Sequence, residues 1–177
     1  MCLVKTYKIK EFLMPVRPEI AKDKSAIATL IARSYLEDGA STIEQTSVLR
    51  SLSSYNNDIS LVSDGDGVVK AFSLYTPVTV AKKPGAVILA PLAIDTKDSA
   101  FDTVSFLEET FKKVTAQGSR YVFLMAELDD LSALGFVFAE DLDFTLAGNP
   151  PVSLLVKDLG VGDKLSGELD LPDILLV

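Results

Sequence analysis

The chain contains no histidine and no tryptophan, and its single cysteine, Cys2, lies near the N-terminus. Because Ser-His-Asp triads, Cys-His pairs and histidine-ligated metal sites all depend on histidine, these mechanisms are excluded. A single cysteine also excludes an internal disulfide and a cysteine-ligated zinc, and it is typical of a reducing compartment. We therefore predict no metal centre and a cytoplasmic location.

The sequence also lacks a long apolar run and a cluster of basic residues. No segment reaches the roughly 18 to 20 apolar residues of a membrane span. Residues 1–10, where lysines alternate with apolar residues, lack the unbroken core of a secretory signal. The net charge is -8, whereas nucleic acids and anionic membranes bind cationic surfaces. We expect neither of them to be a partner.

What the sequence does have is the composition of a globular domain, with 48% hydrophobic and 24% charged residues in a chain of 177. A chain of this length fits one domain that buries about 70% of its unfolded surface. We expect residues 16–177 to form that domain and residues 1–15 to be an N-terminal extension.

Two helices are predicted near the start of the domain. Apolar residues recur every three or four positions over residues 23–36, and Gly39 follows as a stop. Ser41-Thr42-Ile43-Glu44 has the spacing of a capping box, which predicts that a second helix begins there and ends near residue 54.

The second half is organised around a buried strand at residues 86–94, which leads through a polar turn into an amphipathic helix. This helix is predicted to begin near residues 99–102 and to end at Gly118. The next apolar run, 121–126, is expected to lie parallel to the first strand, as in other strand–helix–strand units. Pro91 has no N–H to donate to a sheet, so it predicts a bulge or an unpaired edge. Beyond Asp158 the sequence indicates a loop.

Shorter strands complete the predicted sheet. Two runs at residues 59–63 and 68–75 flank a glycine-rich turn, which is typical of a β-hairpin. Apolar runs at 136–138 and 152–156 provide two further strands. Helices, then an antiparallel hairpin, then a parallel crossover predict an α/β fold with a mixed sheet of about six or seven strands and helices on both faces.

Four segments, in this order, resemble the GNAT superfamily of N-acetyltransferases and, within it, the small bacterial YhbS-like branch. Val16-Arg17-Pro18, ahead of the first helix, is similar to the family's opening. Residues 66–69 followed by 76–79 resemble its hairpin and the strand after it. Ala90-Pro91-Leu92-Ala93-Ile94 resembles the family's "GPLAV" strand, and Leu134-Gly135-Phe136 resembles its "FGF" segment.

The resemblance covers about residues 16–156 and implies a single GNAT-like domain that transfers an acetyl group from acetyl-CoA to a small-molecule or protein amine. It implies that the central strand splays away from its neighbour to form a cleft. Backbone groups of Leu92, Ala93 and Ile94 would pair with the pantetheine arm, and the loop after them would wrap the diphosphate. The amine attacks the thioester directly in this family, so the absence of histidine is compatible with the chemistry.

The segment that corresponds to the family's diphosphate loop, Q/R-x-x-G-x-G/A, contains no glycine. Its six positions are Ser99, Ala100, Phe101, Asp102, Thr103 and Val104. Glycine allows a close backbone approach that a Cβ blocks. A carboxylate about 4 Å from a diphosphate costs roughly 1 to 4 kcal/mol, more than the ~0.3–1 kcal/mol that a helix N-terminus contributes to anion binding. We interpret Asp102 as a residue that caps or begins its helix.

The tyrosine that usually precedes the family's "FGF" element is also absent. Three polar side chains near Gly135 are candidates for proton transfer, namely Glu127, Asp129 and Ser132. We take Ser132 and Glu127 as the candidate catalytic residues.

Three functions are compatible with these observations. The first is an acetyltransferase that binds acetyl-CoA through the strand backbone and tolerates a degenerate diphosphate loop. The second is a GNAT-fold binding or interaction module that has lost catalysis and acetyl-CoA binding, with a cleft filled by side chains such as Phe101. The third is a partner domain in an oligomer, such as a homodimer. The sequence does not rank the last two.

Overall fold

The computed structural model describes residues 15–65, 67–98, 101–148 and 152–176, except for the side chains of residues 129 and 130. Their strands form one mixed sheet. Seven of them follow one another across it in the order β1 (Val16–Pro18), β2 (Ser60–Gly65), β3 (Val68–Val80), β4 (Lys83–Ile94), β5 (Tyr121–Met125), β8 (Leu154–Asp158) and β6 (Val137–Phe138). Within this series of seven, neighbouring strands are antiparallel apart from the β4–β5 pair, which is parallel as predicted.

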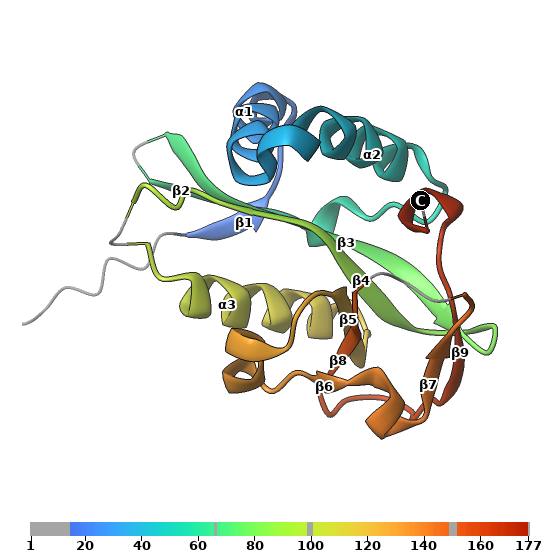
Figure 1. The fold of residues 1–177 in the computed structure, drawn as a ribbon. Helices are drawn as coiled ribbons and strands as arrows, with labels where there is room; N and C mark the ends of the chain where they lie inside the picture. The colour runs from blue at the N-terminus through green and yellow to red at the C-terminus, as the bar shows by residue number, and fades with distance from the viewer. Residues whose placement is uncertain (1–14, 66, 99–100, 149–151, 177) are drawn as a thin grey trace, which may run out of the picture.

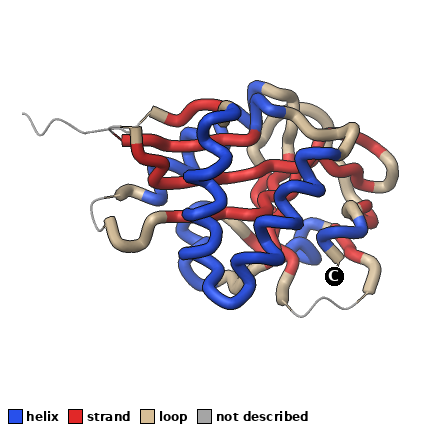
Figure 2. The backbone as a smooth tube through the Cα atoms, turned by 90° about the horizontal axis from the view of Figure 1, so that it is seen from above, coloured by secondary structure: helices blue, strands red, loops and turns tan. Residues whose placement is uncertain are grey.

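Helices cover both faces of this sheet (Figure 1). α1 (Lys24–Tyr35) and α2 (Gly39–Ser51) lie on one face, and α3 (Thr103–Ala116), which connects β4 to β5, lies on the other. Seen from above, α1 and α2 lie across the strands (Figure 2). The described part of the chain also contains short 3₁₀ helices: η1 (Ala21–Asp23), η2 (Leu36–Asp38), η3 (Asn57–Ile59), η4 (Asp129–Leu134), η5 (Ala139–Leu142) and η6 (Asp173–Leu175). The predicted α/β fold with a mixed sheet is therefore confirmed.

The core consists of two layers, one on each side of the sheet. The layer under α1 and α2 contains Ile27 and Ile31 of α1 together with Phe72 of β3. The layer over α3 contains Phe106 and Phe111 of α3. Val104 in the first turn of α3 does not belong to this layer, because the residue is 51% exposed.

The capping-box prediction at Ser41 was wrong, because α2 begins two residues earlier, at Gly39. Ser41 is inside the helix, and its hydroxyl donates to the Asp38 carbonyl at 2.9 Å. Gly39 is not a stop either, since α1 ends at Tyr35 and Leu36 takes a positive φ of 48°. A Cβ on Gly39 would lie 2.8 Å from the Cα of Ala32, so glycine is needed here for the close packing of α2 against α1.

The C-terminal part is more ordered than the predicted loop. β9 (Gly167–Asp170) pairs with the end of β3, at Thr79 and Val80, and with β7 (Phe144–Leu146). With these strands the described sheet has nine strands instead of about six or seven. The sequence around β9 is short and polar, and only the pairing with distant strands makes it extended.

Candidate functional site

β4 and β5 separate part of the way along their length. Their pairing is limited to Ala86, Val87 and Ile88 of β4, opposite Tyr121, Val122 and Phe123 of β5. Beyond that point residues 92–94 pair with β3, while the end of β5 pairs with β8. The central strand is therefore splayed, as the resemblance implied, and one edge of residues 92–94 is not covered by β5.

A bulge lies where the two strands part. Ser73 of β3 pairs with Leu92, but Tyr75 pairs with Leu89, so two residues of β4, Ala90 and Pro91, lie opposite Leu74 alone. The bulge predicted from Pro91 is thus confirmed. A bulge bends its strand, and here it coincides with the point at which β4 leaves β5.

Backbone groups in an antiparallel ladder alternate in direction, and this alternation shows which N–H and C=O groups point toward the uncovered edge. The Asp95 N–H donates to the Lys70 carbonyl of β3 at 2.8 Å. Residues two positions apart face the same way, so Ala93 also faces β3. The N–H and C=O groups of Leu92 and Ile94 therefore point away from β3, toward the gap.

Side chains from the last turn of α1 occupy part of this edge. The Tyr35 hydroxyl donates to the Leu92 carbonyl at 3.0 Å, and the Leu92 N–H donates to the same hydroxyl at 3.2 Å. The Ser34 hydroxyl donates to the Ile94 carbonyl at 3.2 Å. Any ligand that pairs with this edge as an added strand would have to exchange these bonds for its own.

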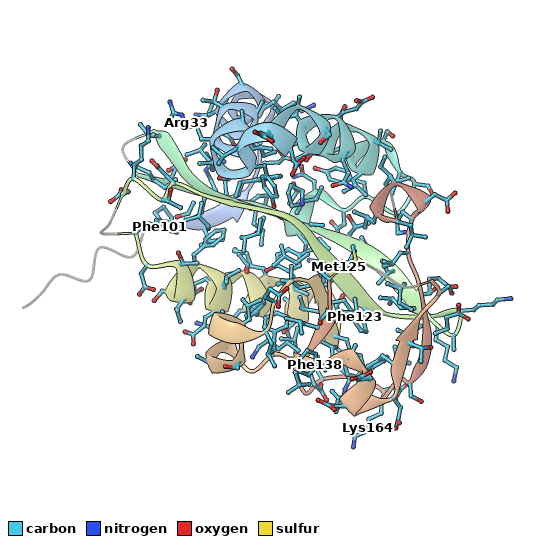
Figure 3. All side chains as sticks on the ribbon, viewed as in Figure 1. Arg33, Phe101, Phe123, Met125, Phe138 and Lys164 are labelled. Carbon is cyan, nitrogen blue, oxygen red and sulfur yellow. The ribbon has the colours of Figure 1, made fainter. Side chains whose placement is uncertain are left out.

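A cavity of about 240 Å³ lies beside the bulge. Residues 88–92 of β4 form one wall, the end of β5 with Met125 forms another (Figure 3), and polar groups enter from Tyr35, Thr42 and Gln45. None of the described side chains that line it is charged. The cavity can therefore hold a small and largely apolar group next to the open edge of β4.

The C-terminal tail lines one side of this cavity. Leu175 of η6 is only 5% exposed and lines it. The Gln45 side-chain amide of α2 donates to the Ile174 carbonyl at 2.8 Å, which fixes the tail against the helix. Neither Leu175 nor Tyr35 was identified from the sequence as a site residue, because no local pattern marks a contact between such distant segments.

At the start of α3 the carboxylate of Asp102 takes the position of a helix cap, as interpreted from the sequence. It accepts the Ser105 N–H at 3.0 Å and the Ser105 hydroxyl at 2.6 Å. The hydrogen bonds from the Ser105 side chain and backbone, and from the Val104 backbone, lower the pKa of Asp102. The helix N-terminus, which would otherwise attract an anion, therefore holds a carboxylate of the chain itself.

The other residues of the predicted diphosphate loop are placed as follows. Ser99 and Ala100 lie outside the described residues. Phe101, beside the first turn of α3 in Figure 3, packs against Phe106 with ring centroids 5.8 Å apart. Thr103 is half-buried and Val104 is exposed.

The chain that leads into this loop carries two further carboxylates. Lys70 of β3 lies 3.4 Å from Asp95 and 3.1 Å from Asp98. Its ammonium is therefore engaged by the protein's own acidic groups, and it is not free to neutralise a diphosphate.

The two candidate catalytic residues lie away from the cavity. Glu127 follows β5 and is exposed, and Ser132 is exposed on η4. Neither lines the cavity beside the bulge. Their assignment stays a prediction.

The described residues contain neither a candidate membrane-spanning helix nor a candidate metal-binding cluster. None of the helices placed by the structure has the length and apolarity required to cross a bilayer. Within the same ranges, no three His, Cys, Asp or Glu side chains are grouped in a way that could hold a metal ion.

The architecture and the splayed strand define the GNAT N-acetyltransferase fold, and solved structures confirm the predicted resemblance. The crystal structure of YhbS from Escherichia coli in complex with CoA has a TM-score of 0.78 and 22% identity, over 92% of both chains. A GNAT family acetyltransferase from Brucella melitensis in complex with acetyl-CoA has a TM-score of 0.70 and 17% identity, over 91% of this chain and 97% of the other. An aminoglycoside 6'-acetyltransferase type Ii has a TM-score of 0.62 and 11% identity, over 85% and 100%. No protein-family model and no curated protein matches the sequence.

Proposed function

We propose that the protein is an acetyl-CoA-dependent N-acetyltransferase of the GNAT superfamily, which transfers the acetyl group to an amine by direct attack. The observation that carries this proposal is the splay of β4 from β5, which leaves the backbone groups of Leu92 and Ile94 on an open edge beside a cavity. Two structures of the same fold, YhbS and the Brucella acetyltransferase, hold CoA and acetyl-CoA.

In this proposal the edge of β4 binds the pantetheine arm of acetyl-CoA. The amide groups of the arm pair with Leu92 and Ile94 as an added strand would, replacing bonds now made by Ser34 and Tyr35. The loop that follows Ile94 lies nearest the diphosphate. The thioester consequently lies at the Leu92 end, where the cavity opens.

The acceptor amine would enter the cavity and attack the thioester carbonyl. An apolar environment favours the neutral form of an amine, and only this form has the free electron pair needed for attack. A volume of about 240 Å³ suits the amine-bearing end of an acceptor. We propose that the acceptor is a small-molecule or protein amine, because only its amine-bearing end has to enter the cavity and the rest can lie outside it.

Glu127 and Ser132 remain candidates for proton transfer, although each would have to act on a part of the acceptor outside the cavity. We also propose a cytoplasmic location, because the single cysteine is typical of a reducing compartment. Assembly as a homodimer is proposed as well, since the sequence is compatible with a partner domain in an oligomer.

A second candidate function is a GNAT-fold module that does not bind acetyl-CoA. The start of α3 favours it, because Asp102 occupies the helix N-terminus and the aligned loop contains no glycine. The two candidates differ in one measurable property, which is the affinity for the thioester arm.

The test is thermal unfolding with increasing acetyl-CoA, together with release of the CoA thiol in the presence of a panel of amines. A ligand at 100 times its Kd stabilises the folded state by about 2.7 kcal/mol. Desulfo-CoA without an acetyl group serves as a control for binding without turnover. A rise in melting temperature with amine-dependent thiol release supports the transferase. No stabilisation at millimolar acetyl-CoA supports the module.

A further inference from the structure

The hydroxyl of Tyr35 lies where the open edge of β4 meets the cavity. It is fixed by two hydrogen bonds to one residue, since it donates to the Leu92 carbonyl at 3.0 Å and accepts from the Leu92 N–H at 3.2 Å. The same side chain lines the cavity. A phenol from α1 is therefore held in place at the boundary between the strand edge and the space beside it.

Along this edge Leu92 marks the reacting end of the cleft. In the proposed binding mode the phosphates lie beyond Ile94, so the thioester lies toward Leu92 and the bulge. The cavity begins at the same point, with residues 88–92 as its wall. In this binding mode the Tyr35 hydroxyl would lie beside both the sulfur of the donor and the amine of the acceptor.

Other groups in the cavity are poorly suited to protonate a thiolate. Apart from Tyr35, the polar side chains that the structure places in its lining are Thr42 and Gln45, and neither is an acid. Burial raises the pKa of the Tyr35 phenol, and its hydrogen bond with the Leu92 backbone lowers it to a lesser degree. The phenol is consequently protonated near neutral pH, as a proton donor must be.

We propose that Tyr35 is the proton donor to the leaving thiolate, a role that rests on the proposed acetyl transfer. The amine nitrogen forms a bond to the thioester carbonyl carbon, and the carbon–sulfur bond breaks with its electron pair on sulfur. Sulfur takes the Tyr35 proton and leaves as the thiol of CoA. The proton lost by the nitrogen returns to the Tyr35 oxygen, which restores the phenol.

The experiment compares wild type, Tyr35→Phe and Tyr121→Phe. Tyr35→Phe removes one oxygen and keeps the ring. Tyr121→Phe is the matched control, because its hydroxyl also meets a backbone N–H, that of Leu165 at 3.4 Å, at the opposite end of the β4–β5 pairing. For each protein the Kd for acetyl-CoA, the kcat for thiol release with a saturating amine, and the melting temperature are measured.

We expect Tyr35→Phe to lower kcat by about 10²- to 10⁴-fold, the usual contribution of a general acid. The Kd for acetyl-CoA should be no higher than that of wild type, because the ligand no longer has to replace the bonds between Tyr35 and Leu92. Tyr121→Phe should keep its kcat. The proposal is overturned if Tyr35→Phe retains the kcat of wild type. It is also overturned if the loss of kcat is matched by an equal loss of affinity for acetyl-CoA or of folded protein. Tighter binding and faster turnover also overturn it, since Tyr35 would then only obstruct the edge. If wild type neither binds nor transfers, the proposed function itself has failed, which is a separate result.

Discussion

Asp102 shows how one residue can alter a binding site without altering the fold around it. As the cap of α3 it accepts both the N–H and the hydroxyl of Ser105, which stabilises the helix. The same carboxylate places negative charge where the diphosphate of the proposed cosubstrate would lie. Its structural and functional effects are therefore opposed, and they can be separated by substitution.

Asp102→Asn is expected to strengthen acetyl-CoA binding while leaving stability nearly unchanged. Asparagine caps a helix about as well as aspartate, but the substitution removes a repulsion of at least about 1 kcal/mol, equivalent to roughly a fivefold lower Kd. Isothermal titration calorimetry with acetyl-CoA measures this change in Kd. S-acetylpantetheine, which carries no diphosphate, is the control ligand and should bind both proteins alike. An equal change for both ligands would show that the charge of Asp102 does not act on the diphosphate.

Glu19 is a second residue whose role is structural. Its side chain is 3% exposed and accepts hydrogen bonds from Arg50 of α2, Tyr55 and Ser60. Glu19→Ala should lower the free energy of unfolding by about 3 to 5 kcal/mol, because Arg50 is left as an unpaired charge. Urea unfolding measures this loss. The exposed Glu37→Ala is the control and should change stability by less than about 0.5 kcal/mol; a similarly small effect at Glu19 would contradict the account.

At the scale of elements, the packing of α2 against α1 places Tyr35 over the edge of β4. The two helices approach closely at Gly39, where a Cβ would meet the backbone of Ala32 at 2.8 Å. Because the obstructing atoms are backbone, the helices themselves would have to move. The position of Tyr35 therefore depends on a glycine that makes no contact with the cavity.

Gly39→Ala is expected to cost about 1 to 3 kcal/mol, which is the usual effect of overpacking, despite the better helix propensity of alanine. Chemical unfolding gives the magnitude. Ala40→Ser, at the exposed neighbouring position, is the control and should stay within about 0.5 kcal/mol of wild type. An increase in stability for Gly39→Ala would show that α1 and α2 separate without cost.

The elements that the sequence predicted well are those whose signal is local. Periodicity identified α1 and α3, and the missing N–H of Pro91 identified the bulge in β4. The capping-box pattern at Ser41 was misleading, because the same spacing also fits the interior of a helix. β9 was missed because its extended form depends on pairing with β3 and β7.

The same limit applies to the site. The segment at residues 90–94 indicated the open edge, since a strand that contains proline has an identifiable backbone defect. Tyr35 could not be predicted, because it meets Leu92 across a separation of 57 residues. Its neighbours in the sequence show only that it belongs to the apolar face of a helix. Contacts of this kind depend on the crossing of whole elements and leave no short motif.

At the scale of the whole molecule, the cavity combines the end of α1, the splayed part of β4, the end of β5 and the C-terminal tail. Distant parts of the chain thus enclose a space that none of them forms alone. Leu175 of the tail completes it, held by the bond from Gln45 to the Ile174 carbonyl. In the proposed function the tail would therefore limit the size of an acceptor.

Leu175→Ala is expected to lower stability by about 2 to 3 kcal/mol, at the low end for a buried leucine, and to lower the KM for bulkier amines relative to small ones. The adjacent Leu176→Ala is the control, because Leu176 is 52% exposed. Thermal unfolding and thiol release with amines of graded size measure both effects. An unchanged size preference in Leu175→Ala would mean that the acceptor does not use this cavity.

The central claim is that the open edge of β4 binds a thioester arm. Its most direct measurement is an NMR titration of the isotopically labelled protein with acetyl-CoA, in which the amide signals of Leu92 and Ile94 are followed. The account predicts that both signals shift and saturate with a common Kd, as the bonds to Ser34 and Tyr35 are exchanged for bonds to the ligand. Amide signals that stay unchanged at Leu92 and Ile94 at millimolar acetyl-CoA would contradict it.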